Sequence, residues 1–366
     1  MLRRALAVAV TGLALALGVE TSSAASHLAD YVYVHDRGTV SQVFAWELDA
    51  DGTLTALPGS PFVAPGMESS NCGGHCKSVA YSRRHRVLYT SHSAGVMAWS
   101  VAEDGSLTVV PGAPFGGTDS FGVIVANRGR RTFVYASNYD DGNVRAYEAA
   151  ADGSLAEIAG SPFAAQPGAL GQALGKGVLC VYNQNSASIS SWKIAADGTL
   201  VEAPDSPLSL PGTDVWFVDS DPKGRYGYVA SDSTVTAVAI NRRTGSLTEV
   251  EGNPFDFGLT DHNGGVAVGR RFAYVPGYLD PDPVLQAFRI GRGGVAVPAG
   301  EPLVTDLSGD DVEGLAVDAR GRRMVMVGSS SALRSFTLDP RTGAPTAADS
   351  ETYAGGGTNG LVIVRR

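Results

Sequence analysis

Two histidines and two aspartates stand at equivalent places ahead of short apolar runs that predict strands. Each lies four residues before the leading apolar residue of its run, namely His75 before Val79, Asp119 before Val123, His262 before Val266 and Asp311 before Leu315. A histidine changes charge near neutral pH, and a carboxylate can hold it in position for proton transfer. We predict these four as candidate catalytic residues, with His75 or His262 as general base and Asp119 or Asp311 orienting it.

Other polar and aromatic side chains surround these four positions. We predict as ligand-binding residues Lys77, Asp214, Trp216, Asp261 and Glu313. Loops that would open on the same side contain His35, His92, Asn138, Asp140, Asn183 and Asp280. Aspartate and asparagine oxygens suit Ca²⁺, whereas paired histidines suit a softer metal, so a divalent cation stays open as a cofactor without an assigned ligand. The alternative is that these residues are polar only because they border a water-filled channel.

A pair of cysteines flanks one of the histidines. Cys72 and Cys76 enclose the segment Gly73-Gly74-His75. In an exported protein this spacing predicts a local disulfide that fixes the loop. A Cys-Cys-His metal site is the alternative, although no fourth ligand is evident.

The composition restricts the elements that can carry these residues. The chain has 366 residues, of which 46 are glycine and 19 are proline, and 44% are hydrophobic. Glycine and proline at this density interrupt long helices, while the hydrophobic content suffices for a core. A helical bundle, a coiled coil and a disordered chain are therefore excluded. The net charge of −9 argues against a nucleic-acid partner, which attracts a surplus of Lys and Arg.

A unit of sequence recurs along the whole chain. Its clearest copy is Asp51-Gly52-Thr53-Leu54 followed by Ser60-Pro61-Phe62, and its aligned glycines are 52, 105, 153, 198, 245, 293 and 343. Three short runs of β-branched, aromatic and small residues precede each copy, and the glycine permits the positive φ of a tight turn. Seven copies at this period predict an all-β, seven-bladed β-propeller of four-stranded antiparallel blades.

The two ends of the repeat predict how the ring closes. The segment Tyr31 to Val34 resembles a second strand, whereas Gly360 to Val364 resembles a first strand. We therefore expect the C-terminal strand to complete the N-terminal blade, which leaves no open sheet edge there. Proline in each Ser-Pro-Phe motif should end the outer strand, because it cannot donate to the ladder.

The turns between first and second strands are rich in arginine and lysine. They include Arg83, Arg84, Arg86, Arg128, Arg130, Arg131, Lys176, Lys223, Arg225, Arg270, Arg271, Arg320, Arg322, Arg323, Arg365 and Arg366. They could form a cationic ring for an acidic polymer or anionic lipid heads. The favoured alternative is ion pairing with aspartates of the turns between third and fourth strands, such as Asp104, Asp152 and Asp197.

The first 25 residues have the pattern of a secretory signal peptide. Arg3 and Arg4 precede an apolar stretch, and Ser23-Ala24-Ala25 offers small residues for cleavage. The arginine pair leaves Sec and twin-arginine export both open. We expect residues 26–366 to form a single propeller domain that is secreted or periplasmic, monomeric and without a membrane span.

With these repeats, the chain resembles the seven-bladed lactonase family, which includes bacterial 6-phosphogluconolactonases and a fungal muconate-lactonizing enzyme. The resemblance rests on the Asp-Gly-Ser/Thr-Leu and Gly-Ser-Pro-Phe units over residues 31–366. It implies the propeller fold and a lactonase-like hydrolase. Catalytic family members carry His-Pro-His and Pro-Arg-His stretches, and this chain has neither.

The sequence therefore supports two functions. The first is an exported lactonase-like hydrolase that opens a neutral lactone or ester at the channel mouth, since an acidic mouth repels a polyanion such as phosphogluconate. The second is a non-catalytic propeller that binds a cell-surface polymer or a protein partner. The sequence leaves open whether the protein is an enzyme.

Overall fold

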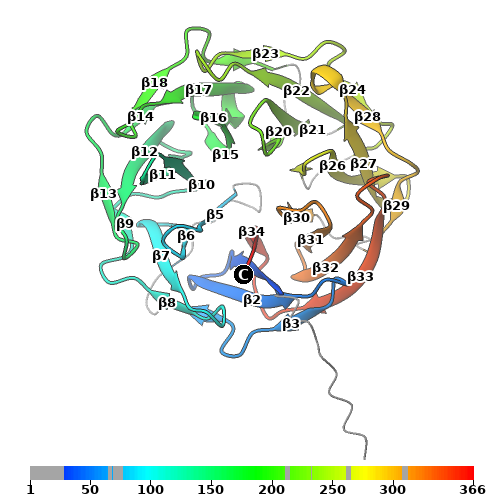
Figure 1. The fold of residues 1–366 in the computed structure, drawn as a ribbon, viewed down its shortest axis with the longest axis horizontal. Helices are drawn as coiled ribbons and strands as arrows, with labels where there is room; N and C mark the ends of the chain where they lie inside the picture. Colours follow the sequence, from blue (N-terminus) through cyan, green and yellow to red (C-terminus); the bar gives the residue numbers. More distant parts are fainter. Residues whose placement is uncertain are drawn as a thin grey trace, which may run out of the picture.

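The repeated units fold into antiparallel sheets that surround a central axis like the blades of a propeller (Figure 1). The computed structural model describes residues 29–64, 68, 77–210, 215–231, 233–260, 265–306 and 312–366. In these residues the strands form seven sheets, so the predicted seven-bladed propeller is confirmed. The predicted signal peptide, residues 1–25, lies outside the described residues.

Within each blade the strands follow one another from the centre of the ring to its rim. Blade 1 comprises β34 (Thr358–Val364), β1 (Asp30–Asp36), β2 (Gln42–Leu48), β3 (Leu54–Ala56) and β4 (Phe62–Val63). Blade 2 comprises β5 (Val79–Ser82), β6 (Val87–His92), β7 (Gly95–Val101), β8 (Leu107–Val109) and β9 (Phe115–Gly116). Blade 3 comprises β10 (Val123–Arg128), β11 (Arg131–Asn138), β12 (Asn143–Ala149), β13 (Leu155–Glu157) and β14 (Phe163–Ala164).

The remaining blades follow the same order. Blade 4 comprises β15 (Ala169–Gly175), β16 (Val178–Asn183), β17 (Ser188–Ile194), β18 (Leu200–Glu202) and β19 (Leu208–Ser209). Blade 5 comprises β20 (Val215–Ser220), β21 (Tyr226–Ser231), β22 (Thr234–Ile240), β23 (Leu247–Glu249) and β24 (Phe255–Asp256). Blade 6 comprises β25 (Ala267–Val268), β26 (Phe272–Leu279), β27 (Asp282–Ile290), β28 (Ala296–Pro298) and β29 (Leu303–Val304). Blade 7 comprises β30 (Val312–Val317), β31 (Arg323–Gly328), β32 (Ala332–Leu338) and β33 (Pro345–Thr352). Two short 3₁₀ turns, Gln184–Ser186 and Arg292–Gly294, lie between strands.

The C-terminal strand closes the ring as predicted. β34 pairs antiparallel with β1, with Tyr31 opposite Val364 and Val34 opposite Leu361. Figure 1 shows β34, in red, beside the blue strands of blade 1 at the inner side of the ring. The innermost strands all begin at one face of the ring, which we call the mouth face, and turn back at the other, which we call the turn face.

The outer strand differs from the prediction in one respect. Proline interrupts it, but in blades 1 to 6 a second piece pairs again with the third strand, as β4 does with β2. The residue before the proline fills the gap, because Ser60 Oγ accepts a hydrogen bond from the Ala45 backbone N–H at 2.9 Å. Ser161, Ser206 and Asn253 do the same in blades 3, 4 and 5. The Ser-Pro motif therefore bridges the outer strand and does not end it.

The core lies between neighbouring sheets. Between blades 3 and 4, for example, Phe133 and Tyr135 pack with Leu179, Val181 and Trp192. Burial of such apolar faces at about 25 cal/mol per Å² is the main force that holds one blade on the next.

A tyrosine of the second strand also reaches the repeated turn of the following blade. Tyr135 Oη donates to the Gly198 carbonyl at 2.8 Å. The same contact joins Tyr33 to Gly105, Tyr89 to Gly153, Tyr228 to Gly294 and Tyr274 to Gly343. Gly198 has φ +92°, and a Cβ there would lie 2.4 Å from the Phe133 ring. The turn must therefore be glycine both for its backbone and for the close approach of the next blade.

Buried charges join the first and last blades. Arg323 forms ion pairs with Asp30 in β1 and with Asp318, the latter at 3.2 Å, and all three residues are buried. The Arg323 guanidinium also donates to the carbonyls of Leu48 and Asp49. Blade 7 is thereby attached to blade 1 by groups that would be costly to separate.

Candidate functional site

The predicted site residues divide by whether the structure describes them. Of the four candidate catalytic residues Asp119 is described, and His75, His262 and Asp311 lie outside the described residues. Of the predicted ligand-binding residues Lys77 and Glu313 are described, and Asp214 and Asp261 lie outside. Trp216 belongs to β20, although its side chain is not described. Cys72 and Cys76 also lie outside, so the predicted disulfide stays a prediction.

Asp119 lies in the loop that leads into β10 on the mouth face. The next residue, Ser120, fastens this loop to the end of β6, because its N–H donates to the His92 carbonyl at 3.1 Å and its Oγ accepts from the His92 N–H at 3.1 Å. Asn138 Nδ2 donates to the Asp119 carbonyl at 2.8 Å. The Asp119 Oδ1 atom is buried and bonds no residue in the described part of the chain. Burial raises the pKa of the Asp119 carboxyl, and the negative charge of Asp140 raises it further.

His92 is the last residue of β6 and lies directly beside this loop. Its Nδ1 accepts a hydrogen bond from the Ala94 backbone N–H at 3.0 Å, so the neutral ring carries its proton on Nε2. Nε2 is buried and has no hydrogen-bond partner among the described residues. Burial lowers the pKa of His92, and the charge of Glu68 opposes this only in part. His92 is therefore an uncharged ring that offers one unused N–H donor.

The ends of the second strands form a series of buried polar residues on the mouth face. Asp36, His92, Asn138 and Asn183 occupy this place in blades 1 to 4. Asn138 Oδ1 accepts from the Asp141 N–H at 2.9 Å, much as His92 Nδ1 accepts from Ala94. The shared task is to stabilise the neighbouring loop. Within this series and among the described residues, only His92 keeps a second polar atom that is buried and has no bonded partner. The sequence analysis names His92 only as one of several loop residues. The signal that could have singled it out is its residue type, because blades 3 and 4 have asparagine at the same position.

A second buried histidine, His35, lies in β1 directly before Asp36. It is completely buried, and its Nδ1 lies 2.8 Å from Ser78 Oγ. Burial lowers the pKa of His35 to about 3, and the nearby His92 contributes in the same direction. His35 is thus held uncharged at any physiological pH.

Lys77 spans the central channel. Its Nζ lies 2.6 Å from Asp219 Oδ1 in β20, and β5 and β20 lie on different sides of the central opening in Figure 1. Asp219 Oδ2 in turn accepts from the Val268 backbone N–H at 2.8 Å, which links blades 5 and 6. Asp219 is not among the residues predicted from the sequence, because it lies near the far end of its strand and not at the start.

Glu313 occupies a register shift near the start of β30. It pairs with Arg37 from the loop after β1, and its Oε2 accepts from the Thr358 N–H at 2.9 Å. These contacts join blade 7 to blade 1 at the mouth face. The role of Glu313 in ligand binding stays a prediction, because its described contacts are structural.

A metal site finds no direct support among the described side chains. In the parts of the chain that the structure describes, no three His, Cys, Asp or Glu residues gather in a way that could hold a metal ion. Most of the predicted oxygen and nitrogen donors lie outside those parts. A bound divalent cation therefore stays a prediction.

Several basic residues of the turn face form ion pairs, but with different partners from those predicted. Arg86 pairs with Glu103, Arg131 with Glu148, Arg225 with Asp221 and Arg366 with Glu47. The aspartates of the repeated turns instead accept backbone N–H groups of their own turns, as Asp104 does from Ser106 and Asp197 from Thr199. The turn itself uses these carboxylates, so no direct ion pair joins them to the arginines in the described part of the chain. The hydrogen bonds within the turn lower the pKa of Asp104 and of Asp197, and the nearby Arg366 and Arg131, respectively, lower it further.

Comparison with known proteins identifies what the chain is similar to. Residues 63–169 match the family model described as "Lactonase, 7-bladed beta-propeller", so the resemblance found in the repeats is confirmed. No curated protein matches the chain. Within the described residues, no helix is long and apolar enough to cross a membrane.

Solved structures with the same fold cover nearly the whole ring. A putative 6-phosphogluconolactonase from Bacteroides fragilis is 14% identical with a TM-score of 0.71, over 93% of this chain and 99% of that one. The periplasmic gluconolactonase PpgL of Pseudomonas aeruginosa is 18% identical with a TM-score of 0.68, over 92% and 99%. A protein from Lactobacillus plantarum is 19% identical with a TM-score of 0.67, over 92% and 99%. At these identities the likeness concerns the fold.

Proposed function

We propose that this propeller is an exported hydrolase that opens an uncharged lactone or related ester at the mouth face. The observation that carries the proposal is a pair of buried polar atoms on adjoining segments, His92 Nε2 and Asp119 Oδ1, that bond none of the described residues. Buried polar atoms without partners are uncommon, and a catalytic role is one of the reasons for which proteins keep them. The lactonase family match and the gluconolactonase with the same fold support this class of reaction.

The two side chains have complementary roles. Asp119, whose raised pKa makes its carboxylate a stronger base, takes a proton from a water molecule that attacks the lactone carbonyl carbon. The His92 Nε2–H donates a hydrogen bond to the carbonyl oxygen as negative charge develops there. The ring C–O bond then breaks, and the proton held by Asp119 passes to the leaving ring oxygen. The net change is addition of one water to give a hydroxy acid.

The charges near the site favour an uncharged substrate. Asp119 and Asp140 are close enough that one raises the pKa of the other, and Glu68 acts on His92. The nearby cation Lys77 is already paired with Asp219. A substrate with several negative charges would be repelled by these carboxylates.

The experiment is a screen of uncharged lactones with the purified mature protein and two variants. His92→Asn keeps an acceptor for the Ala94 N–H, as Asn138 has in the next blade, but removes the Nε2 donor. We expect His92→Asn and Asp119→Asn each to lower kcat by about 100-fold. Asp140→Asn is the matched control on the same face, and we expect its kcat to change less than about three-fold.

The pH profile gives a second readout. Activity requires the ionised Asp119 and should fall as the pH drops through its pKa, which lies above the usual 3.8. Removing the charge of Asp140 should move this acid limb to lower pH. Full activity in both His92→Asn and Asp119→Asn would contradict the assignment of these residues.

The rival function is a non-catalytic module that binds a cell-surface polymer or a protein partner. Lys77 and Glu313, two of the predicted ligand-binding residues, form ion pairs with other blades. These contacts support the rival function because they assign to the structure two residues that a hydrolytic site would use. This function predicts no turnover of any lactone together with saturable retention of the protein on cell envelopes. The hydrolase predicts turnover by a monomer with no need for the envelope.

A further inference from the structure

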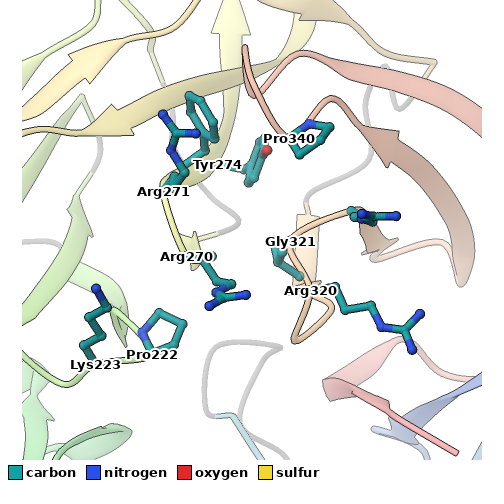
Figure 2. Close-up of a pocket in the computed structure, with 12 residues that line it drawn as sticks. Pro222, Lys223, Arg270, Arg271, Tyr274, Arg320, Gly321 and Pro340 are labelled. Carbon is teal, nitrogen blue, oxygen red and sulfur yellow. The ribbon is translucent and has the colours of Figure 1, made fainter.

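A cavity of about 460 Å³ opens on the turn face, at the opposite end of the strands from His92 and Asp119. It lies where the turns after the first strands of blades 5, 6 and 7 meet. Five of its lining residues are cationic, namely Lys223, Arg270, Arg271, Arg320 and Arg322. Figure 2 shows Arg270 between Pro222 on one side and Gly321 and Arg320 on the other.

These five cations gather around one cavity without a bonded partner among the described residues. None of their side chains forms an ion pair or a hydrogen bond with any described residue, whereas Arg86, Arg131, Arg225, Arg323 and Arg366 each pair with a carboxylate. The carboxylates nearest in sequence are already engaged, because Asp221 bonds Arg225 and Asp318 bonds Arg323. Arg320 is close enough to oppose in part the rise that burial causes in the pKa of Asp30, and the Arg271 guanidinium lies 5.9 Å from the centre of the Phe272 ring. The cavity nevertheless concentrates positive charge without a described carboxylate in bonding contact, on a chain whose net charge is −9.

Part of the cavity wall is apolar. Phe272 and Tyr274 are buried beneath it, and Pro222, Val317 and Pro340 complete its sides. Tyr274 already donates its hydroxyl to the Gly343 carbonyl, so the base is rigid and offers no free donor. A cavity of this size is typical of sites for small molecules, with charged groups at the rim that orient the ligand.

All five cationic side chains are exposed, so their positions are not required by the packing of the blades. Like charges brought together without partners repel one another, and such an arrangement lowers stability slightly unless an anion joins them. Arginine presents several N–H donors in one plane and binds phosphate or carboxylate oxygens in pairs.

We propose that this cavity is a second ligand site, separate from the proposed hydrolytic site, that binds a small molecule carrying two or more adjacent phosphate or carboxylate groups. Arg270 and Arg320, from neighbouring turns, bind the anionic groups from two sides. The apolar part of the wall contacts the uncharged portion of the ligand.

The test uses isothermal titration calorimetry of the whole mature protein with pyrophosphate and with citrate. Sodium chloride at matched ionic strength shows how much of any effect is general screening. Arg270→Gln together with Arg320→Gln should weaken binding of the preferred anion by about ten-fold or more. The comparison of pyrophosphate with citrate tells a phosphate site from a carboxylate site.

The matched control is Arg242→Gln together with Arg243→Gln, which removes two positive charges from the turn between β22 and β23 on the same face and outside the cavity. We expect the control to change the dissociation constant by less than about two-fold. Lactone turnover should be the same in both double variants, so failure of this site is distinguishable from failure of the proposed hydrolase.

Equal weakening in the two double variants would overturn the proposal, because it would mean that only net charge matters. Heat changes that sodium chloride reproduces at the same ionic strength would overturn it as well. Binding of long-chain polyphosphate without binding of pyrophosphate would replace the small-molecule site with docking of a polymer.

Discussion

Replacing Gly198 by alanine tests how closely one blade packs on the next. Gly198 belongs to the repeated turn of blade 4, has φ +92° and faces Phe133 in blade 3. An alanine would place Cβ 2.4 Å from two atoms of the Phe133 ring, closer than side chains tolerate. The left-handed backbone costs about 1–2 kcal/mol for a non-glycine residue, and overpacking adds about 1–3 kcal/mol. We therefore expect Gly198→Ala to lower the free energy of unfolding by about 2–5 kcal/mol.

Gly300 provides the control for this variant. It has φ +82°, close to that of Gly198, but a Cβ there would meet no atom within 4 Å. Gly300→Ala should therefore lose only the backbone contribution of about 1–2 kcal/mol. Tyr135→Phe probes the same contact from the other side, because it removes the hydroxyl that donates to the Gly198 carbonyl, and should cost about 1 kcal/mol.

Urea unfolding followed by tryptophan fluorescence measures all three variants against the native protein. Since Gly198 and Gly300 have similar backbone strain, the difference between their alanine variants isolates contact with Phe133. Equal losses in the two variants would refute the argument, because the repeated glycines would then serve the turn alone and not the packing of blades.

Two further predictions concern buried ionisable groups. The pKa of His35 is about 3 in the folded protein and about 6.5 in the unfolded chain, so only the unfolded chain takes up a proton here as the pH falls below 6.5. The free energy of unfolding should therefore fall by about 2 kcal/mol between pH 7 and pH 5 because of this residue. His35→Asn should not show this part of the fall, and an equal fall in both proteins, measured by urea unfolding, would contradict the prediction. Asp318→Asn should cost about 3 kcal/mol because it leaves buried Arg323 with only one carboxylate partner, whereas Glu148→Gln at the exposed Arg131 pair should cost less than about 1 kcal/mol in the same assay.

The fold could be predicted because its determinants are repeated. One turn glycine has many explanations, but seven at a regular spacing require a unit that recurs, and the contact of Tyr135 with Gly198 shows why the unit keeps its glycine. Ring closure could be predicted for the same reason, since the segment ending in Val364 matches the other first strands. The continuation of the outer strand beyond Pro61 could not, because it depends on the Ser60 hydroxyl bonding a backbone group across the sheet.

The candidate site was harder to predict because side chains of similar type perform different tasks at equivalent positions. Lys77 and Glu313 have the composition of ligand-binding residues, yet their partners Asp219 and Arg37 come from other blades and are brought near only by the fold. Whether His92 is available for chemistry depends on which of its ring nitrogens already bonds the loop.

In a repeat protein, information about function therefore lies in the departures from the repeat. At the ends of the second strands, asparagine suffices to hold the loop in blade 3, so the histidine of blade 2 brings an N–H that the fold does not need. On the turn face, Arg225 and Arg323 have carboxylate partners in their own turns, whereas the side chains of Arg270 and Arg320 bond no described residue. Both departures leave polar groups without a hydrogen bond or ion pair to any described residue, and they do so at opposite ends of the strands. Because a blade is rigid and its two ends share no loop, the two sites should bind their ligands independently, and a variant at one should leave the other unchanged.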